Sequence, residues 1–213
     1  MSFRITPVGV PFNADCLTDP DVFMGYMEDL LEALDWCHKN PWVVHRDVRV
    51  RNLIISYGYS SENLSPQDNR HRLVLIDFDL AAKIDETTHY EGGYICCPLE
   101  LLRKIKQQHT EQQLRRMQLQ KDNKFDTDER CSLSSCEYKP QAFHDYQGVL
   151  ILLVTLMYPR YFSSFQSQQV ENPDSHEFKL LEQVWNILEN DDMWKPAFKI
   201  VTKTDKDGLL KCI

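Results

Sequence analysis

The sequence lacks any apolar run long enough to form a membrane-spanning helix. Its longest run, GVLILLVTLMYP from Gly148, falls well short of the ~20 residues that such a helix needs. The opening stretch MSFRITPVGV also lacks the charged start and apolar core of a signal peptide. We therefore expect an intracellular protein, cytoplasmic or nuclear, that does not bind a membrane and buries the run at Gly148 as a helix.

The sequence also lacks an excess of positive charge. The net charge is -8 and the pI is near 5.4, so a nucleic acid would have to be held by a local basic patch against an unfavourable overall field. We therefore expect no nucleic-acid partner.

The cysteines lack the even number and regular spacing of a disulfide framework. There are seven of them. An odd number of cysteines without regular spacing is typical of a protein from a reducing compartment. Cys131 with Cys136, or Cys96 with Cys97, could be read as half of a zinc site, but no second pair of Cys or His completes either one at finger-like spacing. Free structural thiols are the favoured interpretation.

What is present is ordinary globular material. The chain has 213 residues, of which 42% are hydrophobic and 26% charged, enough for one well-buried domain spanning residues 1–213. We find no internal repeat. The patterns below predict a mainly α fold with a small β-hairpin, of the α+β class.

Helical patterns dominate. Residues 17–40 place apolar side chains at spacings of one, three and four, on one helical face. Asp19 followed by Pro20 predicts the start of that helix, because the carboxylate caps it and proline has no amide to lose there. Residues 149–157 are apolar on nearly every side and predict a buried helix, and another amphipathic helix begins at His176.

Two short β-branched runs, 52–56 and 73–78, flank a polar, turn-rich segment and predict a hairpin. Residues 103–141 are rich in Gln, Lys, Arg, Asp and Ser, which predicts an exposed, partly helical insertion.

An unusual concentration of charge lies between apolar flanks in the segment VVHRDVRVRNLII, residues 43–55. Asp47 is followed five residues later by Asn52, and after the hairpin Asp77 ends a hydrophobic strand. Phosphoryl transfer needs a carboxylate that orients the attacking hydroxyl and oxygen ligands that hold Mg²⁺ against the phosphates. These three side chains are candidates for those roles.

The residues also carry a family resemblance. HRDVRVRN, residues 45–52, resembles the protein-kinase catalytic loop H-R-D-x-x-x-x-N, and DFD, residues 77–79, resembles the D-F-G metal motif. The resemblance implies that Asp47 is the catalytic base and that Arg49 stands where most kinases have a lysine and some tyrosine kinases an arginine. It also implies that Asn52 and Asp77 bind Mg²⁺ and the cofactor ATP.

The resemblance implies structural roles for four further residues. His45 would pack under the loop, and Arg46 would be available to an anion of the activation segment. Glu100, in CPLE, stands where kinases close the activation segment with A-P-E. Asp145 resembles the buried aspartate that holds the catalytic loop from below.

The resemblance runs from Phe3 to about Pro159, with a hinge at about 3–12 and an activation segment at 77–100. The style of the motifs, with T-P-V-G at the hinge, is similar to divergent fungal-type or effector-type kinases. It implies a truncated kinase domain: the large C-terminal lobe only, starting at the hinge, with the N-terminal lobe absent. No G-x-G-x-x-G loop and no V-A-I-K lysine precede the hinge. The expected partners are a protein substrate and a protein that supplies or covers the missing lobe.

Departures from the family leave alternatives open. Asp79 replaces the flexible glycine of D-F-G, and Thr87, Thr88 and Tyr90 are either phosphorylation sites or ordinary loop residues. Three functions remain: a kinase that phosphorylates Ser or Thr of a protein, an inactive pseudokinase or interaction module, and a small-molecule kinase of the aminoglycoside-phosphotransferase type. Arg46, Glu100 and Asp145 argue against the third.

Overall fold

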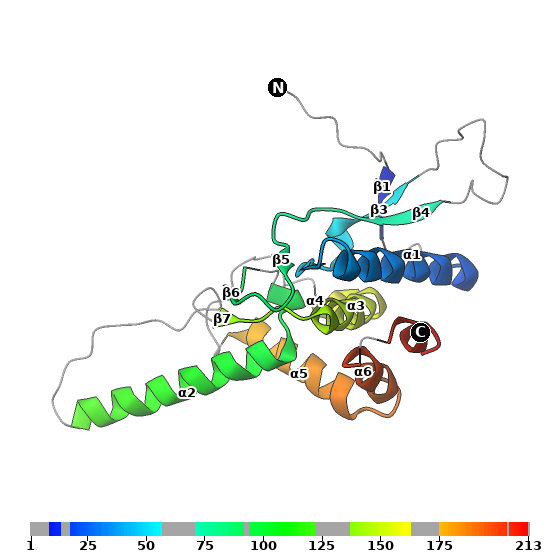
Figure 1. The fold of residues 1–213 in the computed structure, drawn as a ribbon. Helices are drawn as coiled ribbons and strands as arrows, with labels where there is room; N and C mark the ends of the chain where they lie inside the picture. The colour runs from blue at the N-terminus through cyan, green and yellow to red at the C-terminus, as the bar shows by residue number, and fades with distance from the viewer. Residues whose placement is uncertain are drawn as a thin grey trace, which may run out of the picture.

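The computed structural model describes residues 9–13, 18–56, 71–91, 94–121, 137–162, 175–203 and 205–212. Within these ranges helices predominate, and the strands form small antiparallel sheets (Figure 1). The expected α+β class with mostly helical content is thus confirmed. None of the described helices is long and apolar enough to cross a membrane.

The predicted hairpin forms two strands of a three-stranded sheet, with β3 (Leu53–Ser56) at its centre. Strand β3 pairs antiparallel with β4 (Arg72–Leu75), in the register Leu53 opposite Leu75. β4 ends three residues before the predicted end at Phe78. The segment that joins the two strands, residues 57–70, lies outside the described residues.

A third strand joins the sheet, and its pairing with the hairpin was not predicted. β1 (Gly9–Pro11) pairs with β3 on its other side, and it comes from the segment expected to be the hinge, of which residues 3–8 lie outside the described part. A Cβ on Gly9 would lie 2.2 Å from the carbonyl oxygen of Ile55. Only glycine therefore fits this approach of the two backbones.

The first helix starts where the sequence predicts. Helix α1 (Pro20–Lys39) is capped by Asp19, whose carboxylate accepts hydrogen bonds from the amides of Asp21 and Val22. Its apolar face packs against the sheet, and its buried Asp29 accepts a hydrogen bond of 3.0 Å from the amide of Leu73 in β4. The helix and the hairpin thus form one unit.

The apolar run forms the central helix α3 (Ala142–Met157), which is buried along most of its length. It packs against α1, against α6 (Lys195–Val201) and against the short 3-10 helix η4 (Tyr94–Cys96). Because protein surrounds it on most sides, its polar N-terminal turn is also buried, and this turn carries Asp145.

Figure 1 shows α5 (His176–Asn190) and α6 below α3. The predicted C-terminal helix is α5, with Ser175 as its N-cap. α4 (Pro159–Phe162) and α7 (Lys206–Leu210) are short helices.

The expected insertion is not one exposed block. Helix α2 (Leu99–Lys121) begins before residue 103, and its first turns are buried at Leu101, Leu102 and Ile105. Its later turns extend away from the body (Figure 1), with Leu114 and Met117 exposed.

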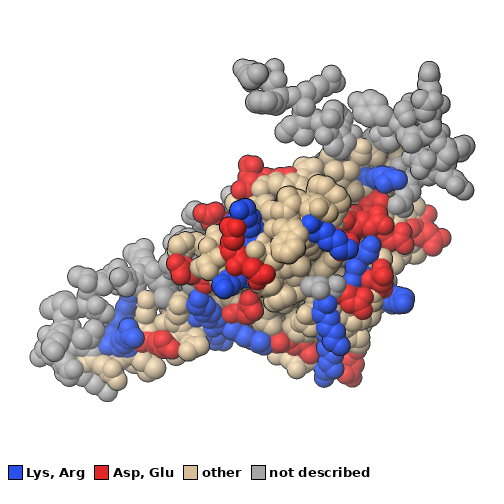
Figure 2. All heavy atoms as spheres, in the orientation of Figure 1, with Lys and Arg blue, Asp and Glu red and all other residues tan. Residues whose placement is uncertain are grey.

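On the face shown in Figure 2, acidic and basic side chains are interspersed over the body.

Two short ladders tie loops to the body. β2 (Val43–Val44) pairs with β5 (Ala82–Lys83), and β6 (Thr88–His89) pairs with β7 (Glu137–Tyr138). β7 lies within the expected insertion, so the end of that segment belongs to the packed body. The first ladder fixes the chain that follows β4 next to the segment 45–52, and the second ties it to the segment that precedes α3.

Gly148 allows α3 to approach this segment, and this contact generates a prediction. A Cβ on Gly148 would lie 3.1 Å from the Cβ of Val48. Gly-to-Ala changes inside helices usually stabilise by ~1 kcal/mol. We expect Gly148→Ala to show none of this gain in thermal unfolding, and to recover it in a Val48→Gly background, where the Cβ of residue 48 is absent and the contact is relieved. An equal gain in both backgrounds would contradict the close contact.

Candidate active site

A buried carboxylate holds the loop 45–52 from below. Asp145, which is 1% exposed, accepts hydrogen bonds from the amide of His45 at 2.8 Å and the amide of Arg46 at 2.9 Å. The Nε2 of His38, at the end of α1, lies 2.9 Å from its Oδ2. The expected place of Asp145 beneath the loop is therefore what the structure shows. Its position in the first turn of α3 also suits a negative charge.

The ring of His45 joins the loop to the end of β4. Its Nδ1 accepts a hydrogen bond from the amide of Asp47 at 3.3 Å, so its Nε2 donates to the carbonyl of Ile76 at 3.0 Å. The ring also stacks edge to face on Phe78, with centroids 4.7 Å apart. One buried side chain thus sets the distance between the Asp47 and Asp77 segments.

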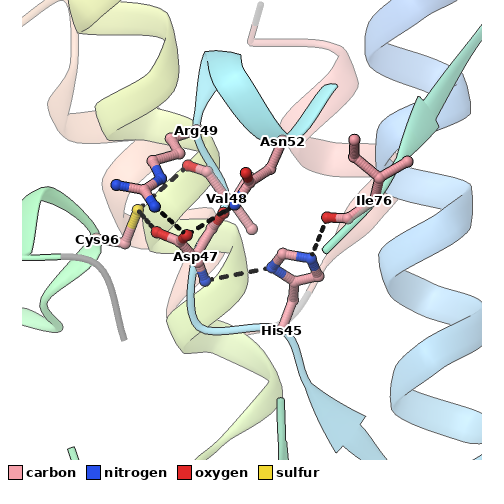
Figure 3. A network of polar contacts seen from close by, with 7 residues as sticks. All are labelled: His45, Asp47, Val48, Arg49, Asn52, Ile76 and Cys96. Carbon is pink, nitrogen blue, oxygen red and sulfur yellow. Dashed lines mark hydrogen bonds and ion pairs between the residues drawn. The ribbon is translucent and has the colours of Figure 1, made fainter. Parts of the chain in front are cut away.

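The carboxylate of Asp47 is the centre of a polar network (Figure 3). Its Oδ2 accepts a hydrogen bond from Nδ2 of Asn52 at 2.7 Å and lies 2.7 Å from Nη2 of Arg49. The same Nδ2 also donates to the backbone carbonyl of Asp47 at 2.9 Å. The structure thus brings three of the predicted site residues together, and Asp47 itself is 1% exposed.

A cysteine completes the surroundings of Asp47, and the sequence did not reveal this. The Sγ of Cys96 lies 3.3 Å from the carbonyl oxygen of Val48 and 3.9 Å from Oδ1 of Asp47 (Figure 3). Burial, followed by the nearby charge of Asp47, raises the pKa of this thiol well above its usual value. Cys96 is therefore a protonated, weak donor.

The free thiols predicted from the sequence are confirmed for the described cysteines. Cys37, Cys96, Cys97 and Cys212 are free, and the described ranges hold no cluster of three or more Cys, His, Asp or Glu able to bind a metal. The other candidate pair, 131 and 136, lies outside them.

Asp77 differs sharply from Asp47 in its environment. It is exposed, has a φ of 68°, and makes no hydrogen bond or ion pair with the described residues. A positive φ is unusual for a residue other than glycine, and no sequence pattern predicted it here. Asp79, which replaces a family glycine, does not have positive φ, so this conformation does not need glycine at position 79.

The donor set fits a hard divalent cation. Both hydrogen bonds of Asn52 use its Nδ2, which leaves its Oδ1 available, and Asp77 is exposed. Oxygen ligands of this kind are those that Mg²⁺ prefers.

The guanidinium of Arg46 is buried and holds the chain that follows Asp77. It donates to the carbonyls of Leu80 and His89, the latter at 3.0 Å, and its Nη2 lies 3.8 Å from the carboxylate of Glu91. The anion expected to meet Arg46 is thus a carboxylate of the segment itself.

Of the three candidate phosphorylation sites, Tyr90 is 2% exposed, and burial raises the pKa of its hydroxyl well above the usual value. A kinase would have to unfold this segment to reach it. Thr87 is exposed and Thr88 is half-buried in β6, so a kinase can reach these two hydroxyls with less disruption of the segment.

Glu100 lies in the first turn of α2, where its exposed carboxylate pairs with His144 at 2.9 Å. His144 accepts a hydrogen bond from the Gln141 amide at Nδ1, so its Nε2 carries the proton that Glu100 accepts. Sequence reasoning missed His144 as the partner, because nothing in its local pattern distinguishes it from a surface histidine.

Comparisons with known proteins agree with this geometry. The family model described as fungal protein kinase matches residues 4–154. The protein named cyclin-dependent kinase-like 5 of Mus musculus is 41% identical over 52 residues, which are 24% of this chain and 5% of that protein. The protein of the same name from Homo sapiens matches with the same identity, over 4% of its length. The chain thus matches only a small part of these relatives.

The anchor at Asp145 predicts a large loss of stability on its removal. Asp145→Ala would leave two loop amides and His38 without their buried charged acceptor, at a cost of about 3 kcal/mol or more. Asp35→Ala is the matched control, because Asp35 forms a solvent-accessible i,i+4 pair with Lys39 and pairs of this kind contribute about 0.5 kcal/mol. Urea unfolding measures both, and similar losses would mean that Asp145 does not anchor the loop.

The Glu100–His144 pair predicts a dependence of stability on pH. The hydrogen bond from His144 lowers the pKa of Glu100 below its usual 4.5. The pair therefore stabilises the fold above that pH, and this contribution is lost as the pH falls through the lower, folded-state pKa. We expect Glu100→Gln to flatten the acid side of the curve of unfolding midpoint against pH. A curve parallel to that of the parent chain would contradict the pairing.

Proposed function

Because the chain belongs to the fungal protein kinase family, we propose that it transfers the γ-phosphoryl group of ATP to a Ser or Thr hydroxyl of a protein. The observation that carries this proposal is the network around Asp47. A carboxylate is held by Asn52 and Arg49 on a loop that Asp145 fixes from below. A fixed carboxylate is what phosphoryl transfer requires to orient the attacking hydroxyl.

Each loop residue has a role in this proposal. Asp47 accepts the proton of the substrate hydroxyl, acting as general base. Arg49 contributes positive charge next to that carboxylate, and its Nε is buried without a hydrogen-bond partner in the described part of the chain. The Arg49 side chain is 18% exposed, and a partly exposed guanidinium at the centre of the site suits an anionic group such as a phosphate.

Mg²⁺ would be held by Asp77 and by the Oδ1 of Asn52. When bound, such a cation neutralises phosphate charge. The positive φ of Asp77 presents its carboxylate to solvent, and His45 keeps this segment at a fixed place relative to Asp47.

A protein substrate is favoured over a small alcohol by the segment that follows Asp77. Arg46 binds it at three points, and the ladder of β6 with β7 holds it against the body. An ordered segment next to the base is a surface on which a polypeptide can dock.

We further propose that ATP is enclosed by a second lobe, supplied by the same polypeptide or by a partner. Phe78 is 43% exposed next to the exposed Asp77, so the described residues form one side of a nucleotide site. In kinases the phosphates are covered from the opposite side by a glycine-rich loop and a lysine.

A second candidate is an interaction module without turnover. The observation that favours it is the surroundings of Asp47, whose two carboxylate oxygens both have partners within the chain. Transfer of labelled phosphate separates the two functions.

The proposed base is tested by Asp47→Asn, with radiolabelled ATP, the second lobe supplied, and protein mixtures or small alcohols as acceptors. Transfer to protein should fall by about 10²–10⁴-fold, as for the loss of a general base. Asparagine keeps one oxygen for Asn52 but loses the ion pair with Arg49, so we expect a modest loss of stability, measured separately. Undiminished transfer by the variant would remove Asp47 from the mechanism, and transfer to alcohols alone would favour the small-molecule kinase.

The metal role is tested by Asp77→Asn, with Asp79→Asn as the neighbouring exposed control. Loss of one anionic oxygen ligand should raise the Mg²⁺ concentration needed for half-maximal transfer. The control variant should keep the metal dependence of the parent chain. If both variants respond alike, Asp77 is not a specific ligand.

A further inference from the structure

The proposed base is closed off from solvent. A general base must come within about 2.6–3.2 Å of the hydroxyl whose proton it accepts. Asp47 is 1% exposed, and Arg49, Asn52 and Cys96 lie against its carboxylate. Arg49 and Asn52 belong to the same loop, so they move with Asp47. Cys96 comes from a different segment and is the contact that a substrate can displace.

The segment that carries Cys96 is the short 3-10 helix η4. It packs against α3, and Cys96 is 5% exposed with its thiol against Asp47 and Val48. The next residue, Cys97, is also buried, at 0% exposure, but its Sγ lies near the carbonyl of Pro98 at 3.7 Å. The two adjacent thiols therefore have different surroundings, and one of them faces the carboxylate.

The attachments on both sides of η4 are firmer than η4 itself. Before it, His89 and Glu91 are held by Arg46, and after it Leu101 and Leu102 bury the first turn of α2. A three-residue 3-10 helix has few and poorly aligned hydrogen bonds, and a thiol is a weak donor. η4 is thus the element near the site that moves at the lowest cost.

We propose that η4 is a plug over the active site, which the contacts of the Cys96 thiol with Val48 and Asp47 hold closed and which a protein substrate displaces. The consequence for catalysis rests on the proposed function, whereas the opening of the plug does not. The plug explains how a base with the geometry of a kinase catalytic loop is inaccessible in the free chain.

Carboxyl labelling of the full 213-residue chain with a carbodiimide and an amine, read by peptide mass spectrometry, tests the plug. Asp77 is the exposed reference, and the buried Asp145 reports global unfolding. In the parent chain Asp47 should react more slowly than Asp77 but faster than Asp145, because the plug opens without unfolding the body. Labelling of Asp47 at the rate of Asp145, or as fast as Asp77, would overturn the proposal.

The variant Cys96→Ala removes the thiol contacts, and Cys97→Ala is its matched control. We expect the labelling rate of Asp47 to rise about fivefold in Cys96→Ala, the effect of one lost hydrogen bond of ordinary strength, with Asp145 unchanged. Cys97→Ala should leave Asp47 at the parental rate. An equal rise in both variants would overturn the plug, and if Cys96→Ala does not fold, the order of rates in the parent chain decides.

Labelling does not depend on phosphoryl transfer, so the two proposals fail separately. Parental and variant chains that transfer no phosphate but show the expected order of labelling would overturn the proposed function and support the plug. Transfer by a chain in which Asp47 is labelled as fast as Asp77 would do the reverse.

Discussion

The carboxylate of Asp145 is a negative charge buried at the centre of the molecule, and the candidate site depends on it. A buried charge is tolerated only when it is fully hydrogen-bonded, and here the donors are the amides of His45 and Arg46 and the ring of His38. Satisfying this one group therefore fixes the backbone of the loop 45–52 and the end of α1 at the same time. Asp47 is positioned as a consequence of that requirement.

Two side chains of this loop fix the segments around it. His45 contacts the carbonyl of Ile76 and the ring of Phe78, so Asp77 is placed relative to Asp47. Arg46 donates hydrogen bonds to the carbonyls of Leu80 and His89. The positive φ of Arg46, 67°, turns its side chain away while its amide faces Asp145. Strain of this kind persists only where the surroundings determine it, which is the case for a loop anchored on both sides.

Much of this could be predicted because the signals are local. Asp19 and Pro20 predict the start of α1, the apolar run predicts α3, and the motif spacing predicts which loop residues meet. Other features depend on contacts between distant segments. The pairing of β1 with β3, the partner of Glu100 and the place of Cys96 over Asp47 each join residues more than 40 positions apart, so no local pattern reports them. The left-handed backbone conformation of Asp77 could not be predicted from the sequence either, because aspartate at a strand end usually adopts an extended or turn conformation.

Hydrogen exchange at the amides of His45 and Arg46 tests the central claim most directly, because these two groups donate to Asp145. If Asp145 anchors the loop, both amides exchange only through global unfolding, at the rate of amides in the middle of α3 such as that of Ile151. If they exchange as fast as the amide of Asp79 in the exposed turn, the loop is not held from below and the geometry around Asp47 is not fixed by the fold.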